Sequence, residues 1–121
     1  MKIAVPAQGD SLDAKIDMRF GRAKCFVIVD SDTWEFEVAD NKQNVQAPAG
    51  AGIQAAQIVA NHGAEVLIAG NCGPNAFRTL KAADIKVFAG LDGTVREAIN
   101  AYKDGKLELA DQANVEAHSG I

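Results

Sequence analysis

A cysteine placed between two glycines is the feature of this sequence best suited to chemistry. The segment Gly70-Asn71-Cys72-Gly73-Pro74-Asn75 follows a mainly apolar run, Ala64 to Ala69, and precedes a helical pattern that starts near Pro74. A strand, a tight turn and a helix in this order direct backbone N–H groups into a cleft at the carboxyl end of the strand. Glycines permit the turn and the close approach of a ligand, and proline suits the first helical position. We therefore expect a binding loop formed by Gly70, Asn71, Cys72, Gly73, Pro74 and Asn75.

The two cysteines of the chain have different expected roles. A thiol at the start of a helix has a lowered pKa, so Cys72 is a candidate metal ligand or redox group; the alternative is a small side chain that fills the turn. Cys25 begins an apolar segment and is expected to be packed and inert. Cysteines this far apart match no common zinc spacing and no dense disulfide framework. Free thiols in a reducing, cytoplasmic setting are the expectation.

A basic segment lies near the N-terminus of an acidic chain. Arg19 and Arg22 flank Phe20-Gly21 in an expected loop, and guanidinium groups can hold an oxyanion or a sulfide-rich cluster through paired donors. The alternative is an ordinary solvated surface. The net charge of −4 argues against nucleic acid or an anionic membrane as the partner, and no run approaches the roughly 20 apolar residues of a membrane-spanning helix.

Motifs typical of enzymes are missing from the sequence. It has no Gly-Lys-Ser/Thr after a glycine-rich loop, no Gly-x-Gly-x-x-Gly fingerprint and no Gly-x-Ser-x-Gly elbow. His62 and His118 are too far apart to suggest a zinc site. An enzyme acting on a phosphate-bearing substrate would require a poised carboxylate or histidine, and no clear candidate occurs. We do not expect an enzyme.

The pattern of apolar residues predicts a single α/β domain. Expected strands cover Ile3–Ala7, Cys25–Asp30, Trp34–Val38, Val66–Ala69 and Ile85–Ala89. The second and third form an antiparallel hairpin. Three helices are expected, beginning after the Gly50-Ala51-Gly52 turn, near Pro74 and after Thr94, where Thr94 and Glu97 form a capping-box pattern. This order implies a mixed five-stranded sheet covered by helices, with a domain at 1–109 and a flexible C-terminal tail at 110–121.

Each expected helix has an apolar stripe that should face the sheet. The stripes are Ile53, Ala56, Val59 and Ala60; then Phe77, Leu80 and Ala83; then Val95, Ala98, Ile99 and Tyr102. If the strands Val66–Ala69 and Ile85–Ala89 are parallel, two helix N-termini meet at one edge of the sheet. Each N-terminus contributes roughly half a positive charge, which predicts an anion site there.

Three segments together resemble a known family. Phe20-Gly21-Arg22-Ala23 leading into the strand Phe26-Val27-Ile28-Val29-Asp30, then Gly50-Ala51-Gly52, then the cysteine loop continuing into Ala76-Phe77, are similar to the dinitrogenase iron–molybdenum cofactor biosynthesis family. That family includes carriers of nitrogenase assembly and the orange proteins, which hold a molybdenum–copper sulfide cluster. The resemblance covers about residues 1–105. It implies a ribonuclease H-like α/β fold without nuclease activity, and the binding of an anionic metal–sulfur cluster.

Two positions depart from the family pattern. Many relatives have histidine where this chain has Arg19 and Ala49, so two imidazole ligands are absent. This favours a cluster held by arginines, backbone N–H groups and Cys72. The resemblance then assigns cluster binding to Arg19, Phe20, Gly21, Arg22, Gly50, Ala51, Gly52 and the cysteine loop, with Cys72 as the metal ligand. The expected function is a carrier or scaffold for a molybdenum- or iron-containing cluster, with a protein partner in delivery, as a monomer or weak dimer. The alternative is a metal-free interaction or regulatory module that binds a small anion or a partner in the same cleft.

Overall fold

The computed structural model describes residues 1–90 and 92–110. In these ranges the strands are β1 (Lys2–Ala7), β2 (Cys25–Asp30), β3 (Phe36–Asp40), β4 (Val66–Ala69) and β5 (Lys86–Ala89). The helices are α1 (Lys42–Val45), α2 (Ala51–Asn61), α3 (Pro74–Ala82) and α4 (Val95–Lys103). The five expected strands and three expected helices are therefore present. The prediction of only three helices is wrong, because the segment between the third expected strand and the Gly50-Ala51-Gly52 turn contains the one-turn helix α1.

The strands form one mixed sheet in the order β3-β2-β1-β4-β5. β2 pairs antiparallel with both β1 and β3, whereas β4 pairs parallel with both β1 and β5. Because β1 and β3 are both antiparallel to β2, all strands except β2 point the same way. α2, α3 and α4 consequently begin at the same edge of the sheet. The mixed sheet and the β2–β3 hairpin are confirmed, and the ribonuclease H-like designation stays a prediction.

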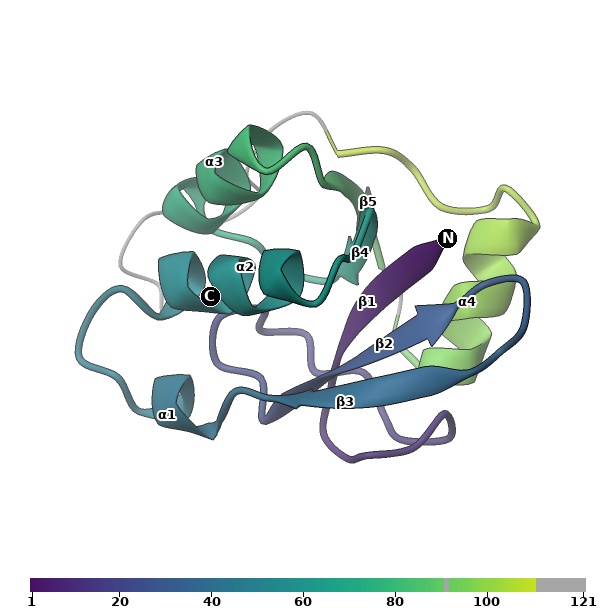
Figure 1. Cartoon of the computed structure of the whole chain (residues 1–121), viewed down its shortest axis with the longest axis horizontal. Coiled ribbons are helices and arrows are strands. Elements are labelled where there is room, and N and C mark those ends of the chain that lie inside the picture. The colour runs from purple at the N-terminus through teal and green to yellow at the C-terminus, as the bar shows by residue number, and fades with distance from the viewer. Residues whose placement is uncertain (91, 111–121) are drawn as a thin grey trace.

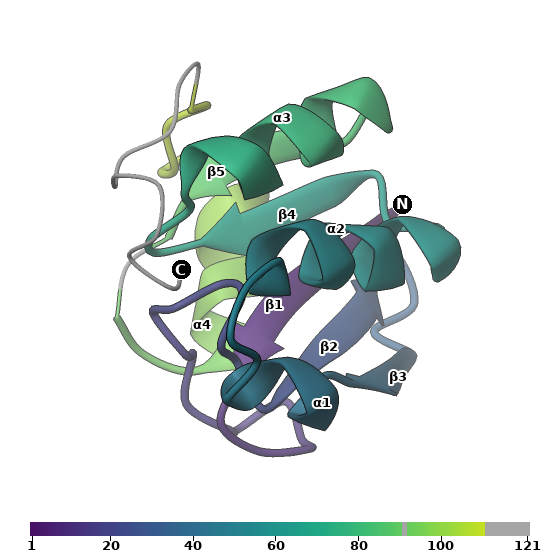
Figure 2. The same cartoon turned by 90° about the vertical axis from the view of Figure 1, so that its left-hand side faces the viewer.

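Helices cover both faces of the sheet. α2 and α3 lie side by side on one face and α4 lies on the other (Figures 1 and 2). Phe26 and Leu67 pack in the cluster beneath α2 and α3, whereas Val27 and Ile68 pack in the cluster beneath α4. All four residues of β4 are buried, as expected for an interior strand with both faces covered.

β3 begins later and is more exposed than its alternating sequence predicts. Trp34 has a φ of 66° and belongs to the preceding turn. Phe36 and Val38 are 43% and 40% exposed. They stand opposite Val29 and Val27, on the α4 face, but β3 is the edge strand and α4 packs over β1. The helix therefore does not extend far enough to bury them.

The helix stripes are confirmed in part. Val95, Ala98 and Ile99 are buried and Tyr102 is half-buried, but Ile53 is exposed and Ala55 is buried instead. Ala83 is exposed because α3 ends at Ala82.

The chain remains attached to the sheet as far as the structure describes it. The Ala110 N–H donates to the Val87 carbonyl at 2.8 Å, and the Ala89 N–H donates to Glu108 at 2.9 Å. The first residue of the expected tail is thus bonded to β5, and the rest of that expected tail, 111–121, lies outside the described residues. Within residues 1–90 and 92–110, no helix has the length and apolarity needed to cross a bilayer.

Candidate functional site

The N-terminal turns of α2 and α3 meet at the end of the sheet where the parallel strands have their carboxyl ends. A β-carbon on Gly52 would lie only 3.0 Å from the β-carbon of Ala76, so the two helices pack at contact distance at their first turns. Gly50, just before α2, has a φ of 77°, which favours glycine. β4 and β5 are parallel, as the expected convergence of helix N-termini required. Two sets of N-terminal backbone N–H groups with their partial positive charges therefore share one surface.

The loop that carries Arg19 and Arg22, residues 18–23 (the arginine loop), is hydrogen-bonded to residues 70–75 (the cysteine loop). The Asn71 N–H donates to the Met18 carbonyl at 2.8 Å, and the Phe20 N–H donates to the Asn71 carbonyl at 3.2 Å. A β-carbon on Gly70 would collide with the flexible end of the Met18 side chain and lie 3.1 Å from the Met18 α-carbon, so a larger residue there would displace Met18. The backbone of residues 18–20 thus continues alongside the end of β4.

Gly21 brings the third predicted segment into the same place. A β-carbon there would lie 3.0 Å from the Gly52 nitrogen, so the arginine loop lies directly against the start of α2. The structure therefore brings together all three predicted segments. Their exposure differs: Arg19, Gly50 and Asn75 are exposed; Arg22, Gly52, Gly70, Asn71 and Pro74 are half-buried; Phe20, Gly21, Ala51, Cys72 and Gly73 are buried.

Arg19 is the more exposed of the two loop arginines. Its side chain is 56% exposed, and its Nε lies 3.4 Å from the Asp17 carboxylate. The same carboxylate oxygen accepts the Arg19 backbone N–H at 3.0 Å. Asp17 is itself buried, so it anchors the base of this side chain. Within the described residues the two terminal guanidinium nitrogens make no hydrogen bond, which leaves them available for an anion.

Arg22 has a structural role, because its side chain holds two segments of backbone together. Its Nη1 donates to the carbonyls of Ala47 at 2.5 Å and Asn44 at 3.1 Å. These bonds attach the segment between β3 and α2 to the arginine loop. The Nη1 hydrogens are therefore engaged by neutral carbonyls.

Two buried asparagines reinforce the same connection. Asn41 Nδ2 donates to the Ala23 carbonyl at 2.7 Å and to the Gly21 carbonyl at 3.3 Å. Asn44 Nδ2 donates to Asn41 Oδ1 at 2.6 Å. Neither residue stands out in the sequence, because asparagines in a polar stretch are typical of exposed turns. They are fully buried and fix the loop that carries Arg22.

Cys72 is buried beside the start of α3. It is 5% exposed and belongs to the same buried cluster as Phe20 and Ala76. Burial raises the pKa of the Cys72 thiol to about 12. The expected lowering of this pKa is wrong, because loss of hydration outweighs any effect of the α3 N-terminus. Cys72 is protonated at neutral pH, and its role as a metal ligand stays a prediction.

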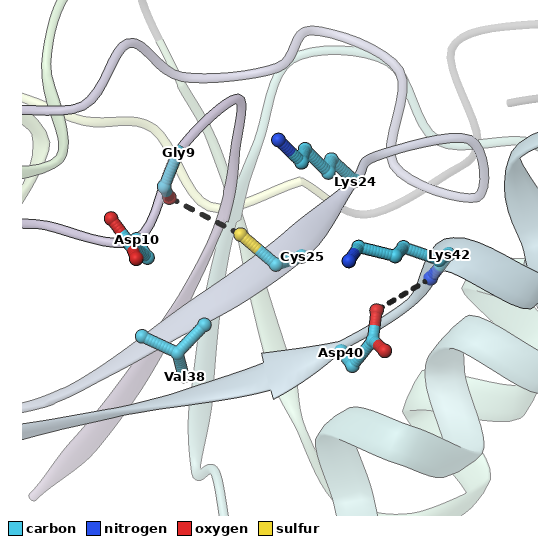
Figure 3. Close-up of a pocket in the computed structure, with 7 residues that line it drawn as sticks. All are labelled: Gly9, Asp10, Lys24, Cys25, Val38, Asp40 and Lys42. Atoms are coloured by element: carbon cyan, nitrogen blue, oxygen red, sulfur yellow. Dashed lines mark hydrogen bonds between the residues drawn. The ribbon is translucent and has the colours of Figure 1, made fainter.

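A second thiol lines a pocket on the other face of the sheet. The pocket has a volume of about 410 Å³ and is lined by Gly9, Asp10, Lys24, Cys25, Val38, Asp40 and Lys42. Figure 3 shows the Lys24 and Lys42 side chains on the same side of the strands as the Cys25 sulfur. Cys25 Sγ donates to the Gly9 carbonyl at 3.2 Å, and burial raises its pKa. The expectation of a packed cysteine is confirmed. The pocket itself was not predicted, and the only hint of it in the sequence is the lysine next to Cys25.

The groups that converge at the strand ends are suited to binding an anion. Within the described residues, no three histidine, cysteine, aspartate or glutamate side chains form a group that could hold a metal ion. His62 lies at the far end of α2, where its Nδ1 is 3.2 Å from Glu37. The converging groups at the strand ends are backbone N–H donors and guanidinium groups, which stabilise negative charge without donating to a metal.

Known proteins are similar to this chain in both sequence and fold. The family model described as dinitrogenase iron-molybdenum cofactor matches residues 1–105. The apo form of the orange protein from Desulfovibrio gigas is 46% identical with a TM-score of 0.91, covering 94% of this chain and 96% of that one. A candidate NifB protein from Thermotoga is 38% identical with a TM-score of 0.82, covering 94% and 97% of the two chains.

One sequence relative extends the comparison to an archaeon. An uncharacterised protein of Methanocaldococcus jannaschii is 32% identical over 113 residues, which cover 89% of this chain and 90% of that protein. The family match spans most of the chain and includes all three segments that meet at the strand ends. The chain therefore belongs to the dinitrogenase iron–molybdenum cofactor family.

Proposed function

We propose that this protein is a carrier or scaffold for an anionic metal–sulfur cluster that contains molybdenum or iron. Its 46% identity to an orange protein favours a molybdenum–copper sulfide cluster as cargo. The observation that carries the proposal is the junction of three segments: the first turns of α2 and α3 touch at Gly52, and the Arg19 loop is bonded across Asn71. In this proposal the cluster is bound and transferred in a reducing cytoplasm, and the protein catalyses no reaction.

The charges and donors at the junction suit a soft, multiply charged anion. Backbone N–H groups at the starts of α2 and α3 would donate to sulfide ligands, and the exposed Arg19 guanidinium would compensate their charge. Arg22 would act mainly by holding the loop in place, since its Nη1 is bonded to carbonyls. Phe20 and Ala51, which are buried, would shape the site from beneath. The buried Cys72 would become a ligand only after losing its proton and turning outward.

Burial of Cys72 also favours a second candidate function. A protein whose only thiol near the site is protonated and packed can serve as a metal-free module, binding a small anion or a partner protein through the same donors. The two candidates differ in whether metal is retained.

Anaerobic reconstitution distinguishes the two functions. The protein is incubated with tetrathiomolybdate, with and without Cu(I), or with iron and sulfide, and is then desalted. A carrier retains molybdenum or iron in a fixed ratio to protein and shows visible charge-transfer absorption. Loss of all metal on desalting under every condition would contradict the carrier function and leave the metal-free module.

Variants of Arg19 and Cys72 separate their contributions. We expect Arg19→Ala to weaken cluster retention about tenfold, as for loss of a charge-assisted contact, and Arg19→Lys to restore part of it. Arg78→Ala is the matched control, because Arg78 is an exposed arginine in the middle of α3. Cys72→Ala should retain the cluster if backbone and arginine donors suffice. Equal retention by Arg19→Ala and Arg78→Ala would contradict the assigned role of Arg19.

A further inference from the structure

The outer edge of β3 is an open strand edge. The Glu35 carbonyl accepts the Asp30 N–H at 2.8 Å, and the Asn41 N–H donates to the Lys24 carbonyl at 3.1 Å, so odd-numbered residues face β2. Because backbone groups alternate along an antiparallel strand, those of Phe36, Val38 and Asp40 face outward. In the part of the chain that the structure describes, no segment pairs with them.

The opposite edge of the sheet, formed by β5, is partly covered by a later segment of the chain. Residues 108–110 bond to β5 through the Glu108 carbonyl and the Ala110 N–H, which cover part of its outer side. Exposed strand edges are usually covered, shortened or charged because they can pair with other chains. β3 has charges but no cover among the described residues.

The two faces of β3 differ in chemistry. Phe36 and Val38 expose apolar surface on the α4 face. On the other face, Glu35 and Glu37 line a shallow hollow of about 220 Å³ together with Asp30, Lys2, Ile28 and part of Phe36. Backbone N–H groups of Asp32 and Thr33 lower the pKa of Asp30, so its carboxylate is charged at neutral pH. Three carboxylates outnumber the two cations beside them, Lys2 and the N-terminal ammonium, which lies 3.9 Å from Asp30, so the hollow is acidic. Glu37 also lies 3.2 Å from His62 Nδ1.

We propose that the outer edge of β3, residues 36–40, is a docking site for an extended segment of a partner protein that joins the sheet as a sixth strand. Backbone bonds to Phe36, Val38 and Asp40 would supply affinity, as in other strand additions. Side chains of the added strand alternate between faces. The segment should therefore place apolar residues beside Phe36 and Val38, and lysine or arginine in the acidic hollow.

The charge of β3 argues for a basic partner rather than a second copy of this chain. Pairing two β3 edges would bring together Glu35, Glu37 and Asp40 from both copies, on chains that each have a net charge of −4. Juxtaposed like charges oppose such pairing. The inference does not depend on cluster binding, because no residue of β3 belongs to the proposed cluster site.

Hydrogen exchange at individual amides tests this docking site. The probe is an acetylated and amidated heptapeptide that alternates lysine with valine, added to the full-length protein up to millimolar concentration. We expect exchange at Phe36, Val38 and Asp40 to slow by about tenfold or more at saturation, while Glu37 and Ala39, already bonded to β2, change little. Absence of slowing at the three outward amides would overturn the proposal.

Two control peptides test the two parts of the inference. The same peptide N-methylated at alternate amides keeps its side chains but cannot complete the strand pairing, so it should not bind. The peptide with glutamate in place of lysine should bind much more weakly. If the N-methylated peptide binds as tightly as the original peptide, strand addition is overturned. If the glutamate peptide binds as tightly, charge recognition is overturned. A dimer that protects the same amides without peptide would show that the edge serves self-association, and would also overturn the proposal.

Variants of the protein complete the test. Val38→Pro removes an outward N–H that no described residue uses, and proline is tolerated on edge strands; it should abolish peptide binding, whereas Val38→Thr should retain it. Glu37→Lys should weaken binding of the lysine peptide and strengthen binding of the glutamate peptide. Binding by Val38→Pro equal to that by Val38→Thr would contradict the proposed backbone pairing. If Val38→Pro fails to fold, the N-methylated peptide decides the same point.

Discussion

Gly52 and Ala76 hold the first turns of α2 and α3 in contact, since a β-carbon on Gly52 would lie 3.0 Å from that of Ala76. This contact places the N-terminal backbone N–H groups of two helices next to each other, at the carboxyl ends of the parallel strands. Gly21 lies against the same point, so the arginine loop is positioned by it as well. The proposed cluster site depends on a position that no larger side chain can occupy without displacement.

Enlarging this position should separate the helices. Gly52→Val forces a branched side chain into the α2–α3 contact, and we expect the free energy of unfolding to fall by about 1–3 kcal/mol. Urea denaturation measures the loss. Gln57→Val, at an exposed position of α2, is the control and should change stability by less than about 0.5 kcal/mol. Equal losses in the two variants would show that the close contact has no energetic consequence.

The buried asparagine that anchors the Arg22 loop should also be important for stability. Asn41→Ala removes donors to the Ala23 and Gly21 carbonyls and leaves them buried without these bonds. We expect a loss of about 1–3 kcal/mol in urea denaturation. Asn100→Ala, on the exposed side of α4, is the control. A loss no larger than that of the control would mean that water readily replaces Asn41.

The capping box at the start of α4 can be tested by rescue. Thr94 accepts the Glu97 N–H at 3.2 Å, and the Glu97 carboxylate accepts the Thr94 N–H at 3.0 Å. Thr94→Ala should lower the free energy of unfolding by about 1 kcal/mol. Thr94→Ser keeps the hydroxyl and should restore most of it. If the serine variant is as unstable as the alanine variant, the hydroxyl is not the stabilising group.

Burial of Cys72 predicts a loss of stability at alkaline pH. Its pKa is about 12 in the folded protein, against about 8.5 in an unfolded chain. Between these values the unfolded state loses the proton first, so the contribution of Cys72 to stability is fully present below pH of about 8.5 and declines as pH rises, by up to ~1.4 kcal/mol per pH unit. Cys72→Ala removes this pH-dependent contribution to the free energy of unfolding.

Stability measured at pH 8 and pH 10 for both proteins isolates the effect, because other titrating groups are common to both. We expect the wild-type protein to lose more stability than Cys72→Ala over this interval. An equal loss would mean that the thiol is hydrated in the folded protein. In that case the original expectation of an accessible, ligating Cys72 would be supported.

The sequence predicted the five strands and the three longer helices, but not the one-turn helix α1 or the exposure of the edge strand β3. The β-branched run at β2 and the alternation at β3 identified a hairpin, since these patterns are local. Exposure of Phe36 and Val38 could not be predicted from alternation, because it depends on β3 being the last strand and on α4 lying over β1. Trp34 was expected in the strand, but the turn that closes the hairpin requires it at φ 66°.

The same limit applies to the site. Glycine-containing turns before α2 and α3 correctly predicted that two helix N-termini converge, because parallel strands end at one edge of a sheet. The direction of the Cys72 side chain depends on packing between α3 and the arginine loop, which no local pattern describes. The tasks of Asn41 and Arg22 were also not predictable, because their partners are backbone carbonyls that any sequence supplies.

The most direct test of cluster binding at this site is the backbone amide NMR spectrum of isotope-labelled protein, titrated without oxygen with tetrathiomolybdate and Cu(I). The proposal predicts that shifts and broadening are concentrated at residues 19–22, 50–52 and 70–75, excluding Pro74, which has no amide hydrogen. Changes concentrated instead at Lys24, Cys25 and Lys42 would place the cargo in the pocket on the opposite face. Such a result, or no change at any residue, would contradict the proposed site.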